Sequence, residues 1–242
     1  MKTAAALVIG NELLSGKVAD ANVLALAREL RRLGVKLRRV VMVLDDLDTI
    51  ADEVRALSAA HDWVFTSGGV GPTHDDVTIE AVARAFGVSI EVSADVERML
   101  RSHYGGRVTD GHLLMARVPS GARLVATPSM PWPTVVMRNV WVLPGVPEIF
   151  RMKLPLLCDE IGCERPFVSL AVITSLDEAD LKPMLDAVVA AYPDVEIGSY
   201  PRWGDLAWRT KLTFDGLVPE RVRAARDAFV DRLPLGTPLQ TE

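Results

Sequence analysis

The chain has 242 residues, of which 49% are hydrophobic and 24% are charged, and its formal net charge is −5. This composition can supply the core of one large domain, or of one medium and one small domain, and the negative charge argues against nucleic acid or an anionic membrane as a partner. The N-terminus lacks the apolar length of a signal peptide, and no stretch approaches the ~20 apolar residues of a membrane span, so we expect a cytoplasmic protein.

Strand and helix patterns alternate through the first part of the chain. Apolar runs of strand length occupy residues 4–9, 37–43, 63–67 and 88–92. Apolar residues at helical spacing mark four helices between and after these runs, at residues 21–33, 47–57, 77–86 and 96–103. Strands that alternate with helices usually pair in parallel and are covered by helices on both faces. The order therefore predicts an α/β fold with a mostly parallel sheet in three layers.

A glycine-rich loop, TSGGVG, joins the third predicted strand to the next helix. Gly68, Gly69 and Gly71 can adopt positive φ angles, so their N–H groups can converge on one anion. The helix that follows directs its free amides and the positive end of its dipole back at the loop. These features predict a phosphate-binding site.

Hydroxyl and carboxyl groups continue this loop. Thr73 and Thr78 offer hydroxyls to phosphate oxygens, whereas Asp75 and Asp76 place negative charge beside a site built for anions. Such a combination is explained by a divalent cation between the carboxylates and the phosphate, and Mg²⁺ is the natural candidate. The alternative is a tight strand-to-helix turn in which one of the aspartates caps the helix.

The rest of the chain predicts a change of architecture. Short strands at residues 123–126, 134–137 and 140–143 are followed by the turn LPGVP and a helix through Leu157. Past Gly162, a strand at 168–174, a helix at 178–192, strands at 195–200 and 207–214 and a helix at 219–233 predict a small α+β unit. We therefore expect domains at residues 1–162 and 163–242. Cys158 and Cys163 are predicted to be ordinary thiols in a reducing compartment.

Three segments that lie far apart in the sequence should meet in space. Asn11, Asp45 and Gly68 each come directly after a predicted strand. Ligands of open α/β sheets bind beyond the carboxyl ends of the strands. The sequence therefore predicts a site at this edge of the sheet.

Four motifs together resemble a known family. They are IGNELLSGKVADAN at residues 9–22, VLDDLDTI at 43–50, TSGGVGPTHDDVT at 66–78 and RNVWVLPGVPEIFR at 138–151. The chain resembles the molybdopterin-binding domain shared by the MoaB and MogA proteins, by CinA and by the first domain of eukaryotic FAD synthase. GNELLSG and LPGVPE are typical of the CinA and FAD-synthase branch. The stretch TPSMPWP at 127–133 lacks the glycine-rich loop of bacterial CinA and is closer to FAD synthase.

The resemblance implies roles for individual residues. Asp45, Asp76 and Glu12 would be catalytic, and the first two would anchor Mg²⁺ or another divalent cation. The implied ligand-binding residues are Gly68, Gly69, Gly71, Pro72, Thr73, Asp75, Thr78, Ser15, Gly16 and Asn22. Other readings stay open, because Asp76 could be a helix cap, Asp45 a plain loop carboxylate, and Asn22 a cap of the first long helix.

Three functions are compatible with these residues. The CinA and FAD-synthase branch implies a metal-dependent hydrolase of a nucleotide pyrophosphate such as ADP-ribose or FAD. A second possibility is molybdopterin binding or adenylylation in molybdenum cofactor biosynthesis. A third is a module that binds a phosphorylated nucleotide or pterin without turnover. We also expect a homo-oligomer, because parallel-sheet domains with so much apolar surface often associate.

Overall fold

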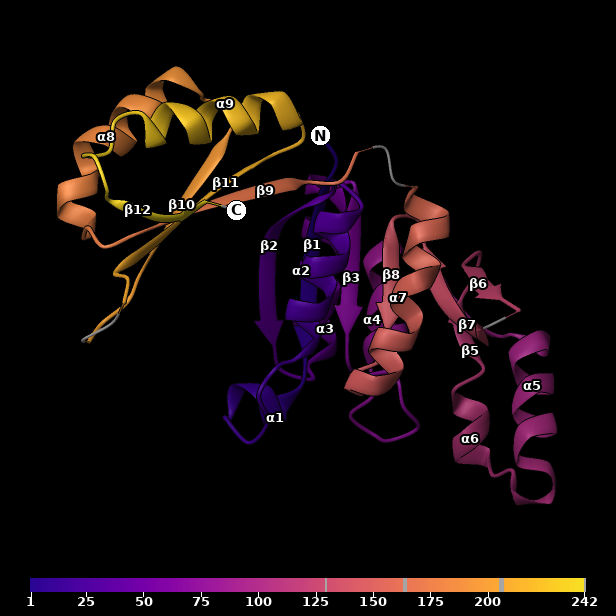
Figure 1. Ribbon diagram of the computed structural model, residues 1–242. Helices are drawn as coiled ribbons and strands as arrows, with labels where there is room; N and C mark the ends of the chain where they lie inside the picture. Colours follow the sequence, from indigo (N-terminus) through magenta and orange to yellow (C-terminus); the bar gives the residue numbers. More distant parts are fainter. Residues whose placement is uncertain (129, 163–164, 205–206, 242) are drawn as a thin grey trace. The chain divides into compact units, whose positions relative to one another are not determined.

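A six-stranded sheet in the order β2-β1-β3-β8-β7-β6 dominates the N-terminal part of the computed structural model, which describes residues 1–128, 130–162, 165–204 and 207–241 (Figure 1). The strands are β1 (Thr3–Ile9), β2 (Lys36–Val43), β3 (Trp63–Ser67), β6 (Arg123–Thr127), β7 (Met130–Met137) and β8 (Val140–Leu143). The first four in the order are parallel, and β7 and β6 run antiparallel to their neighbours. The predicted mostly parallel sheet is confirmed.

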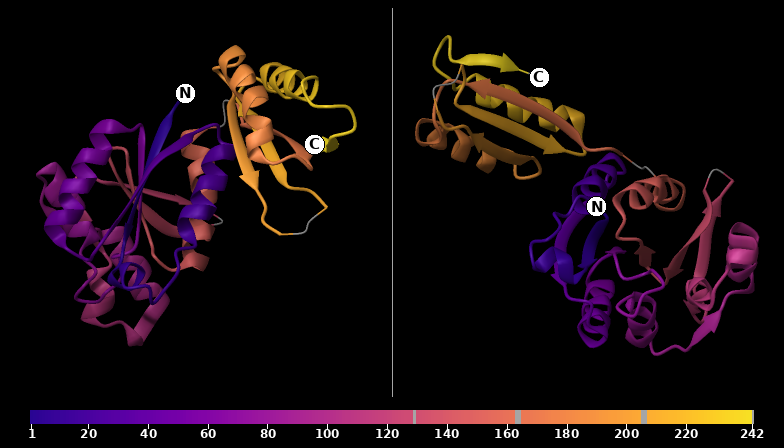
Figure 2. Two further views of the ribbon diagram at one scale, coloured as in Figure 1. Left: turned by 90° about the vertical axis from the view of Figure 1, so that its left-hand side faces the viewer. Right: turned by 90° about the horizontal axis from the view of Figure 1, so that it is seen from below.

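Helices cover both faces of this sheet (Figures 1 and 2). Helices α2 (Asn22–Arg32) and α7 (Pro147–Ile161) pack on the face that receives Ala4 and Ala6 of β1. Helices α3 (Leu47–Ala60) and α4 (Thr78–Phe86) pack on the other face, which receives Ala5 and Leu7. Successive side chains of a strand point to opposite faces, so a strand covered on both sides reads as one continuous apolar run. The three-layer prediction is confirmed.

The segment between α4 and β6 differs from the expectation. Strand β4 (Ile90–Val92) was expected to continue the parallel series, but it pairs antiparallel with β5 (Arg117–Pro119) in a separate two-stranded sheet. The place beside β3 in the main sheet is taken by β8 instead. Helices α5 (Ala94–Tyr104) and α6 (Asp110–Leu114) and a short 3₁₀ helix, Gly105–Arg107, lie between β4 and β5.

Besides β5, α6 and the 3₁₀ helix, two further segments were not expected from the sequence. The four-residue helix α1 (Asn11–Leu14) follows β1 directly. Strand β12 (Pro238–Thr241) pairs with β9 near the C-terminus. Both are shorter than the periodic patterns by which helices and strands are detected.

The C-terminal part forms a second compact unit, so that the chain divides into residues 1–163 and residues 164–242. Its antiparallel sheet has the order β10-β11-β9-β12, built from β9 (Val168–Thr174), β10 (Glu196–Pro201), β11 (Thr210–Gly216) and β12. Helices α8 (Glu178–Ala191) and α9 (Pro219–Val230) supply the rest of its core, in which the rings of Phe214 and Phe229 are 5.7 Å apart. The predicted small α+β unit is confirmed, although β11 begins at Thr210 rather than at residue 207.

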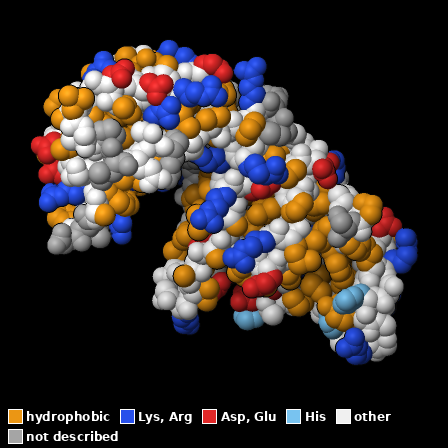
Figure 3. Space-filling model, viewed as in Figure 1, with side chains coloured by type: hydrophobic (Ala, Val, Ile, Leu, Met, Phe, Trp, Pro, Cys, Tyr) orange, Lys and Arg blue, Asp and Glu red, His pale blue; other side chains and the backbone are white. Residues whose placement is uncertain are grey.

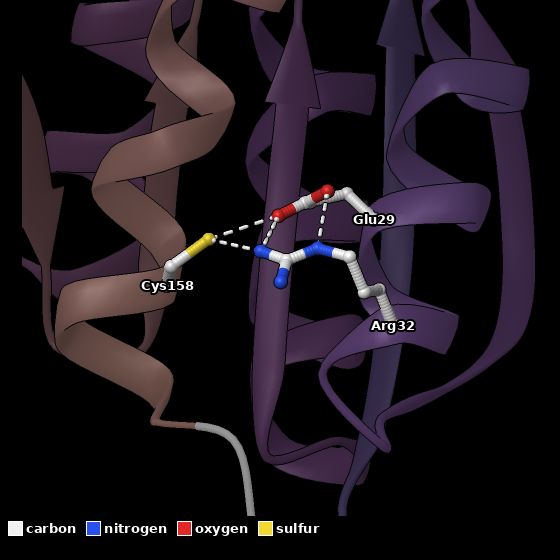
Figure 4. A network of polar contacts seen from close by, with 3 residues as sticks. All are labelled: Glu29, Arg32 and Cys158. Atoms are coloured by element: carbon white, nitrogen blue, oxygen red, sulfur yellow. Dashed lines mark hydrogen bonds and ion pairs between the residues drawn. The ribbon is translucent and has the colours of Figure 1, made fainter. Parts of the chain in front are cut away.

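A polar contact connects α2 and α7 (Figure 4). The Cys158 thiol lies 2.9 Å from Glu29 Oε1 and 2.8 Å from Arg32 Nη2, and Arg32 also pairs with Glu29 at 2.7 Å. Burial and the hydrogen bond to Glu29 raise the pKa of the Cys158 thiol. Cys163, the other cysteine, lies outside the described residues. Among the described helices, none is long and apolar enough to span a bilayer.

The raised pKa makes Cys158 a slow nucleophile at neutral pH, because the thiolate is the reacting form. In a Cys163→Ser background, we expect Glu29→Gln to speed its alkylation by iodoacetamide at pH 7.5 about threefold or more, since the carboxylate is lost and Arg32 stays beside the sulfur. Mass spectrometry of the modified protein measures the rate. Glu91→Gln is the matched control, and equal rates in both variants would refute the assigned cause.

Candidate functional site

The strand ends that the sequence predicts to converge do meet at one edge. Strands β2, β1 and β3 are adjacent and parallel, and their carboxyl ends point to the same side (Figure 1). The backbone N–H of Asn11 donates to Asp45 Oδ2 at 2.8 Å, and the N–H of Asp45 donates to Asn11 Oδ1 at 3.3 Å. The loops after β1 and β2 are therefore linked.

Four carboxylates lie within electrostatic reach of one another at this edge. Burial raises the pKa of Asp45, and the negative charges of Glu12, Asp75 and Asp76 raise it further, against the opposing hydrogen bond from Asn11. Mutual repulsion of this kind is relieved by a cation, and carboxylate oxygens are the ligands that Mg²⁺ prefers. Within the described part of the chain, however, no three acidic, histidine or cysteine side chains are already grouped as a metal site.

Neither of the two proposed metal anchors is a helix cap. Asp46, not Asp45, caps α3 by accepting a hydrogen bond of 2.8 Å from the backbone N–H of Thr49. Helix α4 begins after Val77 and has no side-chain cap. The structural explanation of Asp76 as an N-cap is therefore wrong, and Asp45 is free of a capping role.

Asp76 is held by Thr73 instead. The backbone N–H of Thr73 donates to Asp76 Oδ2 at 2.8 Å, and its hydroxyl lies within hydrogen-bonding distance of both Asp75 and Asp76. A hydroxyl has one hydrogen, so it can satisfy only one of the two carboxylates at a time. Thr73 was expected to donate to a phosphate, but its donors are engaged by these acids. The side chain of His74, which stands between Thr73 and Asp75 in the sequence, is 97% exposed.

The glycine loop passes very close to the end of β1. A Cβ atom at Gly68 would lie 2.1 Å from the carbonyl oxygen of Ile9, and Gly68 has a φ of +112°. Its own N–H donates to Leu143 O at 3.2 Å, so the expectation that this amide binds a ligand is wrong. Among the described residues, the amides of Gly69, Val70 and Gly71 have no protein acceptor, and they remain the available donors.

Two predicted ligand residues position the loop. The Thr78 hydroxyl is completely buried and donates to Gly68 O at 2.9 Å, so it cannot reach a ligand. Asn22 is 4% exposed, and its amide donates to Ser67 Oγ at 2.9 Å and to Gly145 O at 2.8 Å. Asn22 thus joins α2, β3 and the LPGVP turn rather than capping a helix.

The remaining predicted residues are more peripheral. Ser15 and Gly16 follow α1 on an exposed turn, where the Ser15 hydroxyl donates to Glu12 O at 3.2 Å. Pro72 and Asp75 are also exposed. None of these four lines the cavity described next.

A cavity of about 690 Å³ opens on the other side of the glycine loop. Its lining combines the loop with residues of α5, β5, β7 and α7, and the surface here is largely apolar beside a group of acidic side chains (Figure 3). Ligand pockets typically measure about 300–1,000 Å³ and are mainly apolar with a few polar groups. Asp76 and Thr73 reach the cavity, whereas Asp45 and Glu12 do not. Asp76 therefore connects the cavity with the carboxylate group around Asp45.

Lys153 and Trp132 are cavity residues that the sequence did not reveal. Lys153 is only 7% exposed and lies on the apolar stripe of α7 with Phe150, Leu154 and Leu157. A lysine on such a stripe is a signal that could have been noticed. Trp132 contacts His103 with ring centroids 5.5 Å apart, a pairing between β7 and α5 that no local pattern indicates.

Comparison with known proteins gives matches along the whole chain. Residues 5–161 match the family described as a probable molybdopterin binding domain, and residues 166–241 match the middle domain of FAD synthase. A protein of Archaeoglobus fulgidus is 32% identical over 93% of this chain and 95% of its own length. A probable FAD synthase of Caenorhabditis elegans is 35% identical over 92% of this chain, which spans about half (48%) of that relative.

A solved structure agrees with these matches. The protein CinA of Thermoplasma acidophilum, whose function is described as unknown, is 32% identical with a TM-score of 0.61. The match covers 66% of this chain and 98% of that one.

We expect divalent cations to stabilise the protein through the carboxylate cluster. Millimolar Mg²⁺ or Mn²⁺ should raise the melting temperature, and Asp45→Asn should abolish the rise, because the like-charge repulsion around Asp45 is then already reduced. Without cation, Asp45→Asn should melt at the same temperature as the wild type or higher. Differential scanning fluorimetry measures both, with Asp52→Asn as control. A full cation response in Asp45→Asn would contradict this prediction.

Lys153 should make stability depend on pH. Burial lowers its pKa from 10.5 to about 8, so the unfolded chain binds more protons than the native protein between these values. The native state is penalised below pH 8, and the penalty is lost as the pH rises to 10.5. Relative to Lys153→Met, the wild type should gain about 3 kcal/mol over this interval, at ~1.4 kcal/mol per pKa unit. Urea unfolding at pH 8 and at pH 10.5 measures the free energy of unfolding, with Lys182→Met as control. If this free energy depends on pH in the same way in the wild type and in Lys153→Met, the prediction is refuted.

Proposed function

Since the chain belongs to the molybdopterin-binding-domain family, in the branch related to CinA and FAD synthase, we propose that it is a metal-dependent hydrolase of nucleotide pyrophosphates of the ADP-ribose or FAD class. The observation that carries the proposal is the meeting of three features at one loop. The loop residues with free amides and the carboxylate Asp76 line the same largely apolar cavity, and Asp76 is within electrostatic reach of Asp45. A nucleotide diphosphate has matching parts, with an apolar ring and charged phosphates.

The amides of Gly69, Val70 and Gly71 would hold one phosphate group. Backbone N–H groups that are fixed in place before the ligand arrives stabilise phosphate oxygens without reorganisation. The close approach of Gly68 to Ile9 O and the hydrogen bond from Thr78 keep the loop in this conformation.

The carboxylates fit a hard divalent cation because they offer only oxygen ligands, and because burial and, after it, the neighbouring negative charges raise the pKa of Asp45. When bound at Asp45 and Asp76, such a cation would neutralise charge on the phosphate oxygens. Thr73 occupies only Oδ2 of Asp76, so Oδ1 of Asp76 is the oxygen that would bind the cation.

Hydrolysis itself requires a water and a proton acceptor. The water oxygen would bond to one phosphorus as its bond to the bridging oxygen breaks, and the bridging oxygen would leave with the second phosphate. Glu12 is exposed beside Asp45 and is the carboxylate that we assign to accept the proton of the water.

Molybdopterin is the second candidate ligand, and the match of residues 5–161 to a probable molybdopterin binding domain favours it. A pterin with a phosphate would use the same amides and the same cavity. In that case the protein would bind or adenylylate the pterin instead of hydrolysing a dinucleotide. A homo-oligomer remains a prediction under either function.

Product release tests the proposal. Purified protein should release AMP from FAD or ADP-ribose when Mg²⁺ or Mn²⁺ is present, and Asp76→Asn and Asp45→Asn should each lower kcat by about 10²-fold or more, as is typical when a stabilising group is lost from the transition state. Chromatography of the nucleotide products gives the rate. Asp52→Asn, an exposed aspartate of α3, is the matched control.

The alternatives give different results in the same assay. AMP release that is equal in the wild type and Asp76→Asn would refute the hydrolase. Adenylylation of molybdopterin with ATP would favour the second candidate. Tight retention of either ligand without turnover would favour a binding module.

A further inference from the structure

The cavity beside the glycine loop contains an ion pair that the proposed function does not use. Arg117 of β5 and Glu80 of α4 both line the cavity, and Arg117 Nη1 lies 2.6 Å from Glu80 Oε1. Their side chains are 37% and 27% exposed, and ion pairs that keep contact with water contribute little to stability. Stability alone is therefore a weak reason for two charges in a largely apolar wall.

Arg117 has hydrogen-bond donors to spare. A guanidinium group carries five N–H hydrogens in one plane. In the described part of the chain, Glu80 is the ion-pair partner of Arg117, and it engages one nitrogen. The Nε and Nη2 groups are therefore available to an acceptor in the cavity. Such a planar fork matches two oxygens of one phosphate group.

The other cation of the lining is already engaged. Lys153 Nζ donates to Trp132 O at 2.9 Å and to Pro133 O at 3.1 Å, and Lys153 is only 7% exposed. Two backbone carbonyls thus hold this ammonium group in the wall. Arg117 is the cation of the lining that keeps most of its donors.

The charges of the lining balance before a metal ion binds. With the histidines neutral, the carboxylates of Asp76 and Glu80 offset the positive charges of Arg117 and Lys153. A divalent cation at Asp76 would leave this surface with two positive charges. The two linked phosphates of a nucleotide pyrophosphate carry one negative charge each, so the cation and the guanidinium can each face one phosphate.

We propose that Arg117 is a further catalytic residue, which binds the departing phosphate while Glu80 orients its guanidinium. This inference rests on the proposed function, which places the other phosphate on the loop amides. When the bond between phosphorus and the bridging oxygen breaks, its electron pair stays on that oxygen, and the leaving phosphate gains one negative charge. The attacking water passes its proton to Glu12. A guanidinium fixed beside the leaving group would stabilise the new charge.

Two substrates separate this role from the rest of the machinery. FAD leaves a phosphate behind, whereas the 4-nitrophenyl ester of AMP loses nitrophenolate, which has no phosphate for Arg117 to hold. With Mg²⁺, Arg117→Gln should lower kcat/KM for FAD about tenfold or more, as the loss of a hydrogen bond to a charged group does, and leave that of the ester within about twofold. Asp76→Asn should slow both reactions. Equal losses on both substrates in a folded Arg117→Gln would overturn the inference.

Further variants assign the effect to the guanidinium. Arg117→Lys keeps the charge without the planar fork, so its rate on FAD should lie between those of the wild type and Arg117→Gln. Glu80→Gln should slow FAD hydrolysis, but it should add nothing in the Arg117→Gln background, because it acts through Arg117. Arg123→Gln is the matched control, since Arg123 also pairs with a glutamate, Glu160, at 2.9 Å but does not line the cavity. Circular dichroism confirms that each variant is folded.

A binding comparison decides the inference even if FAD is not hydrolysed. In α,β-methylene-ADP a carbon joins the two phosphates, so the bridge cannot be cleaved, whereas AMP has one phosphate. In calorimetric titrations with Mg²⁺, the wild type should bind the analogue at least about tenfold more tightly than AMP, and Arg117→Gln should lose most of this preference.

The outcomes of the titration are distinct. No preference in the wild type, or a full preference in a folded Arg117→Gln, would overturn the inference. If Arg117→Gln does not fold, a full preference in Arg117→Lys would overturn it instead. A preference that depends on Arg117, without release of AMP from FAD, would support the phosphate contact while refuting the hydrolase.

Discussion

The glycine loop crosses the carboxyl end of β1 so closely that any side chain at Gly68 would collide with the carbonyl oxygen of Ile9, which a Cβ would approach to 2.1 Å. Only glycine tolerates both this approach and the positive φ of the position. The completely buried hydroxyl of Thr78 and the buried amide of Asn22 then fix the loop to α4, α2 and the LPGVP turn. The free amides and Asp76 follow on this loop, so the crossing fixes where the loop that carries them leaves the end of β1.

Two ionisable groups in unfavourable surroundings flank the loop. On one side, burial and neighbouring carboxylates raise the pKa of Asp45; on the other, burial lowers the pKa of Lys153. Perturbed groups of this kind cluster at functional sites, because a ligand can supply the partner that the protein withholds. For Asp45, the cation of the proposed function would be such a partner.

The fold and one half of the site could be predicted because their signals are local. Apolar runs mark β1 to β3, and apolar residues at helical spacing that end at a glycine mark the helices between them. Parallel pairing of these strands then brings Asn11, Asp45 and Gly68 to the carboxyl edge of the sheet. The order of the segments therefore predicts the convergence without any knowledge of side-chain contacts. The pairing of β4 with β5 was missed, since both strands have only three residues.

The other half of the site, the cavity, depends on contacts between segments that are distant in the sequence. Trp132, His103 and Lys153 come from β7, α5 and α7, and no spacing along the chain shows that they share a cavity. Hydrogen bonds also reassign residues that look alike in the sequence. The Thr78 hydroxyl is buried under the loop, while that of Thr73 is held by the acids, although both follow the glycines. Hydroxyl direction is set by packing, which the sequence pattern does not encode.

The central claim is that carboxylates from separate loops act as one cation site. A double-mutant cycle on Mn²⁺ affinity, measured by isothermal titration calorimetry with the wild type, Asp45→Asn, Asp76→Asn and the double variant, tests it most directly. Residues that share a bound ion are coupled, so the two single losses should not add, and the coupling energy should be about 1 kcal/mol or more. Strictly additive losses, or Mn²⁺ binding that neither substitution weakens, would contradict the account.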